Sequence, residues 1–438
     1  MIIVWLTSGL VYAILPFQLI GRTVSLEGFG IFGLFLLAFF LGVAVIGHAQ
    51  ENEDAEWQRM PDFSRVDRIL KWAGMLANIC FLIDLQGRDV FDLTDAYLRR
   101  SDQASALLAG VTSASSTWFQ LGFLFYPAGY VYVARHLTFE KTRSLPKLFA
   151  FGFLPVLLAT LAMGGRSPLF YCLVITVLAS SARQLLQTRQ QRLLRRQRRL
   201  DSAPLATFAF ISICGTALYY FVEVFLTRAE VSGGTATAFD WAESAWGIGF
   251  RGTTSEFWFQ VLGEEGAYLA FVFPWYFIQG LLMGTLILGD YDGPMQFGVY
   301  GVDLISAVAR RVDGSLVASH FDSLMQLGTY GFFPSAFGSL FVDFRFLGLP
   351  PCALWGALTG LVYQRIRARR DARWLLCGPF VTAGILFSFN NTPLGVSNGL
   401  MTHIWLLLAF RMSIPRRAES TTAVESPSLR SVRPVSSQ

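Results

Sequence analysis

Charged side chains are scarce in this chain: Asp, Glu, Lys and Arg make up only 15% of its 438 residues, against 53% apolar residues. That balance excludes an ordinary soluble globular protein. Apolar runs recur instead, and most approach the roughly 17 to 20 residues that a helix needs to cross a bilayer. They lie at 2–20, 28–47, 69–83, 118–134, 148–163, 168–182, 204–222, 267–289, 349–363, 374–389 and 399–410. The sequence therefore predicts an all-α, polytopic integral membrane protein with about 11 or 12 transmembrane helices.

The sequence also lacks the motifs of several enzyme classes. It contains no Gly-rich Walker loop, no HExxH, no CxxC, no nucleophile elbow and no large soluble domain. Its five cysteines lie in or beside apolar runs without paired spacing, which is typical of small buried side chains rather than disulfides or metal ligands. A nucleotide-driven pump and a transferase with a cytoplasmic nucleotide-sugar domain are therefore disfavoured, and no cofactor, metal or nucleic acid is expected.

Basic residues are concentrated in a few connecting segments. The stretch 183–199 holds seven arginines and no acidic residue, 364–373 holds five arginines, and Arg135, Lys141, Arg143 and Lys147 mark a third segment. Short loops rich in Lys and Arg stay on the cytoplasmic side of a membrane, and the net charge of +5 follows this topology. The pattern predicts a chain that starts inside and crosses a membrane many times.

One part of the chain does not fit simple alternation. If 204–226 leaves the cytoplasm and 267–289 returns, one more crossing would place the basic segment 364–373 outside. Either 267–289 does not cross fully, or 296–309 forms a short or broken extra span, which needs to be buried in protein or to line a cavity. Both alternatives leave 311–348 outside. The predicted organisation is a transmembrane domain at 1–413 with outer loops at 227–266 and 311–348, followed by a disordered cytoplasmic tail at 414–438.

Arg166 lies in the stretch LAMGGRSPLF, at an outer turn between two closely linked spans. Ser167 and Pro168 suit a helix start, with a hydroxyl cap followed by a proline at the first helical position. A helix N-terminus favours anions, and a guanidinium beside it would complete a phosphate or diphosphate clamp. The alternative is an arginine whose charge reaches the lipid headgroups.

A second group of polar residues is expected on the outer side at 317–369. His320 is suited to acid–base chemistry near neutral pH. Asp343 and Arg345 flank Phe344 in an apolar stretch, where they would bind sugar hydroxyls or phosphate, or pair with each other. Since Pro350 and Pro351 suit the start of a crossing helix, 335–348 is predicted to be an interfacial or re-entrant helix.

Other outer polar residues are candidates for binding an anion or a sugar. An ionisable residue inside a membrane helix is a functional candidate by default, and amides suit hydrogen bonding to a polar ligand or helix capping. These candidates are Arg228, Arg251, Arg310, Arg311, Glu223, Asn390 and Asn391.

The chain resembles Wzy-type oligosaccharide repeat-unit polymerases, in the wider group of O-antigen polymerases and ligases. The resemblance rests on the outer turn GGRSPL followed by a basic cytoplasmic loop, and on TYGFFPSAFGSLFVDFRFLGLPPCALWGALTGLVYQRIRAR. Arg345 stands where the group has a glycine after Asp-Phe, with Gly348 three residues later. The segment SHFDSLMQLGTYG is also similar to the ligase pattern of a histidine followed by a Gly-x-x-Gly turn.

The resemblance implies a GT-C-like membrane glycosyltransferase that acts without a metal at the periplasmic face of a bacterial inner membrane. It would polymerise oligosaccharide units carried on undecaprenyl diphosphate into surface polysaccharide, with membrane lipid, a chain-length regulator and a flippase as partners. Arg166 would stabilise the leaving diphosphate, and His320 or Asp343 would act on the acceptor hydroxyl. Two alternatives stay open: an O-antigen ligase, which needs almost the same residues, and a polysaccharide or lipid-linked oligosaccharide transporter, for which mid-membrane charges and inverted repeats are expected.

Overall fold

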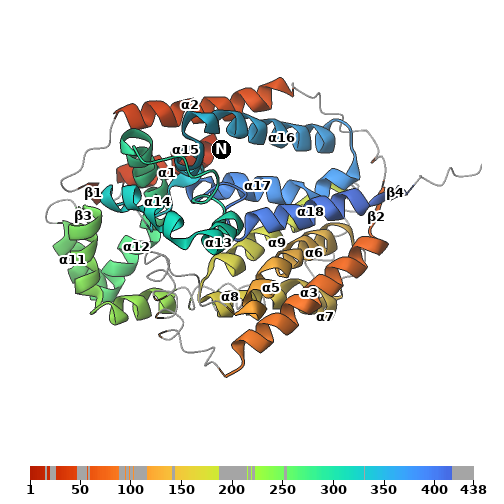
Figure 1. Cartoon of the computed structure of the whole chain (residues 1–438), viewed down its shortest axis with the longest axis horizontal. Helices are drawn as coiled ribbons and strands as arrows, with labels where there is room; N and C mark the ends of the chain where they lie inside the picture. Colours follow the sequence, from red (N-terminus) through yellow and green to blue (C-terminus); the bar gives the residue numbers. More distant parts are fainter. Residues whose placement is uncertain are drawn as a thin grey trace, which may run out of the picture.

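The computed structural model describes residues 1–14, 17–19, 26–46, 57, 60–87, 94, 98, 102, 116–140, 144–186, 215, 219, 222–250, 254–329 and 331–416. This part of the chain is nearly all helical, in agreement with the predicted fold class (Figure 1). The elements of the first half are α1 (Ile2–Ile14), β1 (Phe17–Leu19), α2 (Leu26–Val45), β2 (Met60–Asp62), α3 (Ser64–Leu85), α5 (Thr117–Phe125), α6 (Pro127–Phe139), α7 (Leu145–Leu148), η1 (Phe149–Phe153), α8 (Leu154–Met163) and α9 (Ser167–Leu186).

The second half begins with a helical segment at 222–231. It continues with α11 (Thr235–Trp246), β3 (Ile248–Phe250), α12 (Thr254–Asp290), α13 (Asp303–Val312), α14 (Gly314–Gln326), α15 (Ser335–Phe344), η2 (Arg345–Gly348), α16 (Leu349–Arg367), η3 (Ala372–Leu376), α17 (Gly378–Leu386), η4 (Phe387–Phe389), α18 (Gly399–Met412) and β4 (Ile414–Arg416). The first three residues of the predicted disordered tail thus form a strand. The rest of that tail lies outside the described residues.

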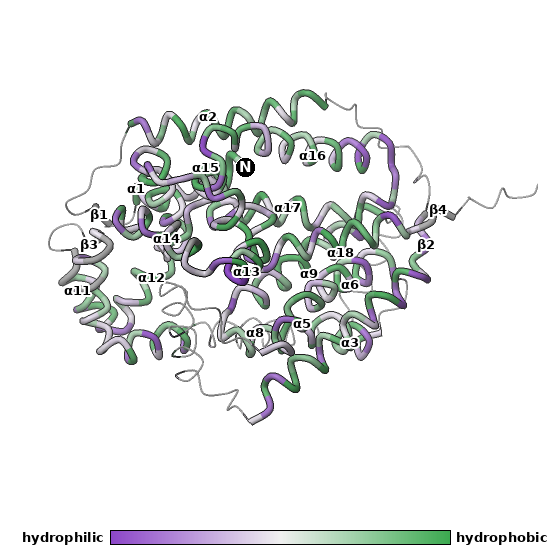
Figure 2. The backbone as a smooth tube through the Cα atoms, in the orientation of Figure 1, coloured by the Kyte–Doolittle hydropathy of each residue, from purple (hydrophilic) through white to green (hydrophobic). Residues whose placement is uncertain are grey.

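Six helical stretches in the described residues are long and apolar enough to cross a membrane, which confirms a multi-pass membrane architecture. They are Leu26–Val45, Leu145–Met163, Ser167–Leu186, Phe257–Asp290, Ser335–Arg367 and Ala372–Phe389. Hydrophobic residues follow the lengths of these helices, whereas hydrophilic residues gather where α16 ends (Figure 2). Nearly all of the predicted span 204–222 lies outside the described residues, so the total of 11 or 12 spans stays a prediction.

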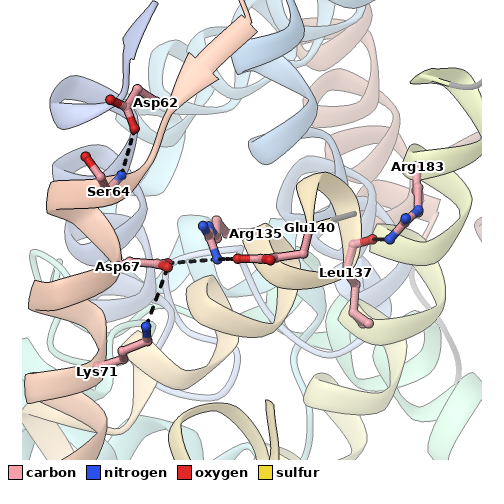
Figure 3. A network of polar contacts seen from close by, with 8 residues as sticks. All are labelled: Asp62, Ser64, Asp67, Lys71, Arg135, Leu137, Glu140 and Arg183. Carbon is pink, nitrogen blue, oxygen red and sulfur yellow. Dashed lines mark hydrogen bonds and ion pairs between the residues drawn. The ribbon is translucent and has the colours of Figure 1, made fainter. Parts of the chain in front are cut away.

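The ends of the basic segments meet at one end of the helix bundle, here called the cationic end. It is defined by β2 and β4, which pair antiparallel (Figure 1). Arg135, at the end of α6, forms ion pairs with Asp67 of α3 at 2.9 Å and with Glu140 at 2.7 Å (Figure 3). Arg183, near the end of α9, donates to the carbonyl oxygen of Leu137 in the same view. The positive-inside pattern predicts that these basic segments lie on the same side, and the structure places these ends at the same end of the bundle.

Helices α2 and α16 run side by side in the same direction along one edge of the molecule (Figure 1). Their glycines allow close backbone packing: a Cβ atom added at Gly42 would overlap the Ala353 carbonyl group, and one at Gly356 would overlap that of Phe39. Since both helices run in one direction, α16 ends at the same side as α2. The basic segment after α16 therefore reaches the cationic end, and helix α2 starts at the opposite end.

Helix α12 is the element that the sequence left ambiguous. Its backbone breaks at Gly263, where φ is 71° and ψ is 176°, and the helix from Glu264 to Asp290 is continuous after that break. At about 1.5 Å per residue this helix is roughly 40 Å long, so its length is sufficient for a crossing. Its neighbours, rather than its length, must decide its position.

Those neighbours lie at helix ends opposite the cationic end. Along its length α12 touches the start of α9, the end of η4 and the start of α2. The contacting pairs are Tyr276 with Arg166, Gly280 with Phe389, and Thr285 with Gly28. A helix that meets these three ends in turn lies across the bundle end, which favours the alternative that 267–289 does not cross fully. The other alternative, a short or broken span at 296–309, stays a prediction: α13 begins within this stretch and has 10 residues, about 15 Å of helix.

Candidate functional site

The turn that carries Arg166 is built by its two glycines. Gly164 ends α8 in the left-handed region with φ 57°, a conformation that glycine adopts without steric cost. The amide of Gly165 donates to the carbonyl of Thr160 at 3.3 Å. On the other side, the amide of Phe170 donates to the Arg166 carbonyl at 3.0 Å, so Arg166 occupies the cap position of α9. Ser167 is the first helical residue rather than the predicted cap.

The side chain of Arg166 lies in an aromatic frame. It is only 9% exposed. Its Cζ atom lies 4.0 Å from the centroid of the Phe225 ring, and its Nη2 donates to the hydroxyl of Tyr276 at 3.3 Å. The Phe225 and Tyr276 rings are themselves in edge-to-face contact, 5.3 Å between centroids. An arginine that only reached for lipid headgroups would not be buried between rings, so the structure favours a built site over that alternative.

Stacking and hydrogen bonding use different parts of the guanidinium. Stacking engages the flat face of the group, whereas its five N–H donors point outward along its edge. A guanidinium in a desolvated site binds phosphate more strongly than one in water. The arrangement can therefore hold an anionic oxygen at the start of α9, where free backbone amides add a partial positive charge.

Asp343 serves the backbone of a neighbouring turn. It is 3% exposed, and its two carboxylate oxygens accept hydrogen bonds from the amides of Tyr300 at 3.1 Å and Gly301 at 2.9 Å. A carboxylate held in this way stabilises the turn. Each of its oxygens keeps a second lone pair, so the role of Asp343 as a general base stays a prediction.

Arg345 also binds backbone, and it does not pair with Asp343 as the alternative interpretation required. It donates to the carbonyl oxygens of Tyr291 and Gly293, which follow the last turn of α12. Its Cζ lies 4.2 Å from the Tyr291 ring centroid. Burial raises the pKa of Tyr291, outweighing the hydrogen bond from Gln296 and the charge of Arg345, so this hydroxyl stays protonated and donates to Pro294. Arg345 fixes the end of α12 rather than facing a substrate.

Asn390 and Asn391 follow η4, at the level where Phe389 packs on α12. Asn391 donates to the carbonyl oxygen of Gly301 at 3.3 Å and accepts from the amide of Thr392 at 2.6 Å. Asn390 is half-buried. The structure therefore brings Asn391 and Asp343 together at Gly301, and it brings the asparagine turn and Arg166 to successive turns of α12.

The remaining candidates do not join one cluster. Arg310 donates to the carbonyl of Ser306 within α13, and Arg311 donates to Gln120 of α5. Arg228 lies one turn after Phe225 and Glu223 lies two residues before it, so Arg228 shares the Phe225 side of this helical segment and Glu223 does not. Arg251 and the side chain of His320 lie outside the described residues. Among the described residues, no group of three or more His, Cys, Asp or Glu side chains could hold a metal ion.

The frame of Arg166 contains two residues that the sequence did not single out, Phe225 and Tyr276. Both lie in or beside apolar runs, where aromatic residues are expected for packing alone. The one available signal was the hydroxyl of Tyr276, because a buried tyrosine hydroxyl normally has a hydrogen-bond partner. No sequence spacing identified that partner as a residue 110 positions earlier.

No family model, curated protein or solved structure matches the chain.

Proposed function

We propose that this chain is a membrane glycosyltransferase that polymerises lipid-diphosphate-linked oligosaccharide units at the face opposite its cationic end. The observation that carries the proposal is the buried Arg166 at the start of α9, framed by Phe225 and Tyr276. An arginine is costly to bury, and this one lies on the side where the positive-inside bias disfavours basic residues. Anion binding is the role that explains this placement.

The proposed reaction is a glycosyl transfer. A hydroxyl of the acceptor sugar attacks the anomeric carbon of the donor sugar, the bond from that carbon to the diphosphate oxygen breaks, and lipid diphosphate leaves. The hydroxyl proton passes to a general base. Arg166 would stabilise the charge that develops on the leaving diphosphate, an interaction that is stronger in the transition state than in the ground state.

The proposed general base is His320 or Asp343. Asp343 also holds the backbone amides of Tyr300 and Gly301. His320 belongs to α14, which follows α13, and α13 is joined to the start of α5 by the contact between Arg311 and Gln120. Helix α5 starts at the end where α3 finishes, opposite the cationic end. Asn390 and Asn391 would hold sugar hydroxyls on the same side.

The decisive experiment replaces Arg166 by Ala and by Lys in the full chain and measures polysaccharide chain length on cells. We expect Arg166→Ala to leave single lipid-linked units on the outer side, with Arg166→Lys partly active, because lysine keeps the charge but loses the paired N–H donors. The matched control is Arg411→Ala, an exposed arginine at the end of α18. Full-length polymer from a correctly inserted Arg166→Ala variant would refute the proposal. Lipid-linked units that accumulate on the cytoplasmic side of the membrane would indicate a transporter. Full-length glycan that is made but not transferred to its final acceptor would indicate a ligase.

A further inference from the structure

Asp343 is a buried carboxylate whose negative charge is not matched by a cation. Its side chain is only 3% exposed, and the ion pairs of the described residues do not include it. Arg345, two residues later, donates to backbone carbonyl oxygens instead. The amides of Tyr300 and Gly301 that donate to the carboxylate carry no net charge. Buried charges in proteins are normally paired with an opposite charge or bound to a metal ion.

Ser339 supplies a second buried oxygen beside this carboxylate. It lies one helical turn before Asp343 on α15, a spacing that places the two side chains on the same face of the helix. Ser339 is fully buried, and its Oγ atom has no hydrogen-bond partner. A buried hydroxyl normally has one. Carboxylate and hydroxyl oxygens together are the hard ligands that alkali and alkaline-earth cations prefer.

Gly301 keeps the space beside both oxygens open. A Cβ atom added at this glycine would lie 2.6 Å from Oδ2 of Asp343 and 3.4 Å from the Cβ atom of Ser339. The first distance is shorter than any ordinary contact of a Cβ atom, so every other residue would fill the side of the carboxylate that Ser339 shares. The glycine therefore allows a ligand to reach the two oxygens.

We propose that Asp343 and Ser339 bind a sodium ion, with the carboxylate and the hydroxyl as its oxygen ligands. A single carboxylate supplies one negative charge, and the hydroxyl is neutral, so a monovalent cation balances the site whereas a divalent one would leave an excess of buried positive charge. The ion ties α15 to the turn at Gly301. This inference does not rest on the proposed function, and it leaves His320 as the general base of the proposed transfer.

The test measures Tm and the binding of radioactive sodium for the purified full-length chain, in NaCl and in choline chloride at equal ionic strength. We expect one sodium ion bound per chain, and a Tm that rises by about 2 °C for each tenfold increase in NaCl above the Kd. Ser339→Ala should lose both responses. In choline chloride its Tm should equal or exceed that of the unaltered chain, because the hydroxyl has no partner to lose.

The matched control is Ser8→Ala, another buried serine, whose hydroxyl donates to the carbonyl oxygen of Phe277 at 2.7 Å. It should lower Tm by the same amount in both salts and keep the sodium response. Three results would overturn the inference: an unaltered chain that binds no sodium, a Ser339→Ala or Asp343→Asn variant that binds it as the unaltered chain does, or a larger Tm rise with CaCl2 than with NaCl. The proposed function fails separately, if Arg166→Ala cells still make full-length polymer.

Discussion

Gly280 is the point where α12 packs on the turn that holds the two asparagines. A Cβ atom added at this glycine would lie 2.7 Å from the carbonyl carbon of Phe389, and closer still to its oxygen. Ordinary contact begins at 3.4 Å. The substitution Gly280→Ala therefore has to separate α12 from Phe389 by at least about 0.7 Å, because backbone cannot move aside as a flexible side chain does.

The expected magnitude follows from that displacement. Overpacking of this kind costs about 1–3 kcal/mol of stability. Tyr276 lies one turn before Gly280, so the same shift moves its hydroxyl relative to Arg166. Since a misplacement of about 1 Å can cost on the order of a hundredfold in rate, we expect polymer formation to fall at least tenfold.

The assay measures Tm of the purified chain together with polysaccharide chain length on cells. The matched control is Gly33→Ala in α2, where an added Cβ meets no atom within 4 Å. This control should leave Tm unchanged or slightly raised, because alanine favours a helix over glycine. If Gly280→Ala behaves like Gly33→Ala in both measurements, the close packing of α12 on Phe389 is wrong.

Two further predictions test the position of single residues. Asp343→Asn should lower the free energy of unfolding by about 1.5–3 kcal/mol. The new side-chain NH2 group would face one of the two backbone N–H groups that now donate to the carboxylate. A lower Tm supports this backbone role, whereas full stability with no activity would identify Asp343 as the base. In a variant free of other cysteines, Glu265→Cys and Asp292→Cys place exposed thiols at the two ends of the continuous part of α12 that follows Gly263. Both should react with an impermeant maleimide from the outer side, and reaction of Asp292→Cys from the inside only would show that α12 crosses.

The turn at Arg166 could be predicted because its determinants are local. Two glycines, an arginine and Ser-Pro within one short stretch specify the end of one helix and the start of the next. The break before Pro350 and Pro351 was predictable for the same reason, and α15, η2 and α16 confirm it. Apolar runs of sufficient length likewise indicated the crossing helices.

The partners of the predicted residues were not accessible in this way. Asp343 and Arg345 stand two positions apart, which suggested a mutual pair, yet each binds backbone groups of the turn after α12. Backbone amides and carbonyls have no signature in a sequence, because every residue carries them. The Tyr276 partner of Arg166 was hidden for another reason, since only the tertiary packing of α12 brings the two together.

The position of α12 also decides which candidates can act on one substrate. An apolar run of this length is compatible with crossing the bilayer or with lying across helix ends, because both environments are apolar. If Asp292 reacts from the same side as Glu265, then α13 and α14, which follow Asp292, lie on the side of Arg166, and His320 can serve the same reaction. If it reacts from the opposite side, α12 crosses, and the chain has to return through 296–309 before Arg311 can reach Gln120 at the start of α5. His320 lies on the side of Arg166 in both cases, and the labelling decides which segment brings it there.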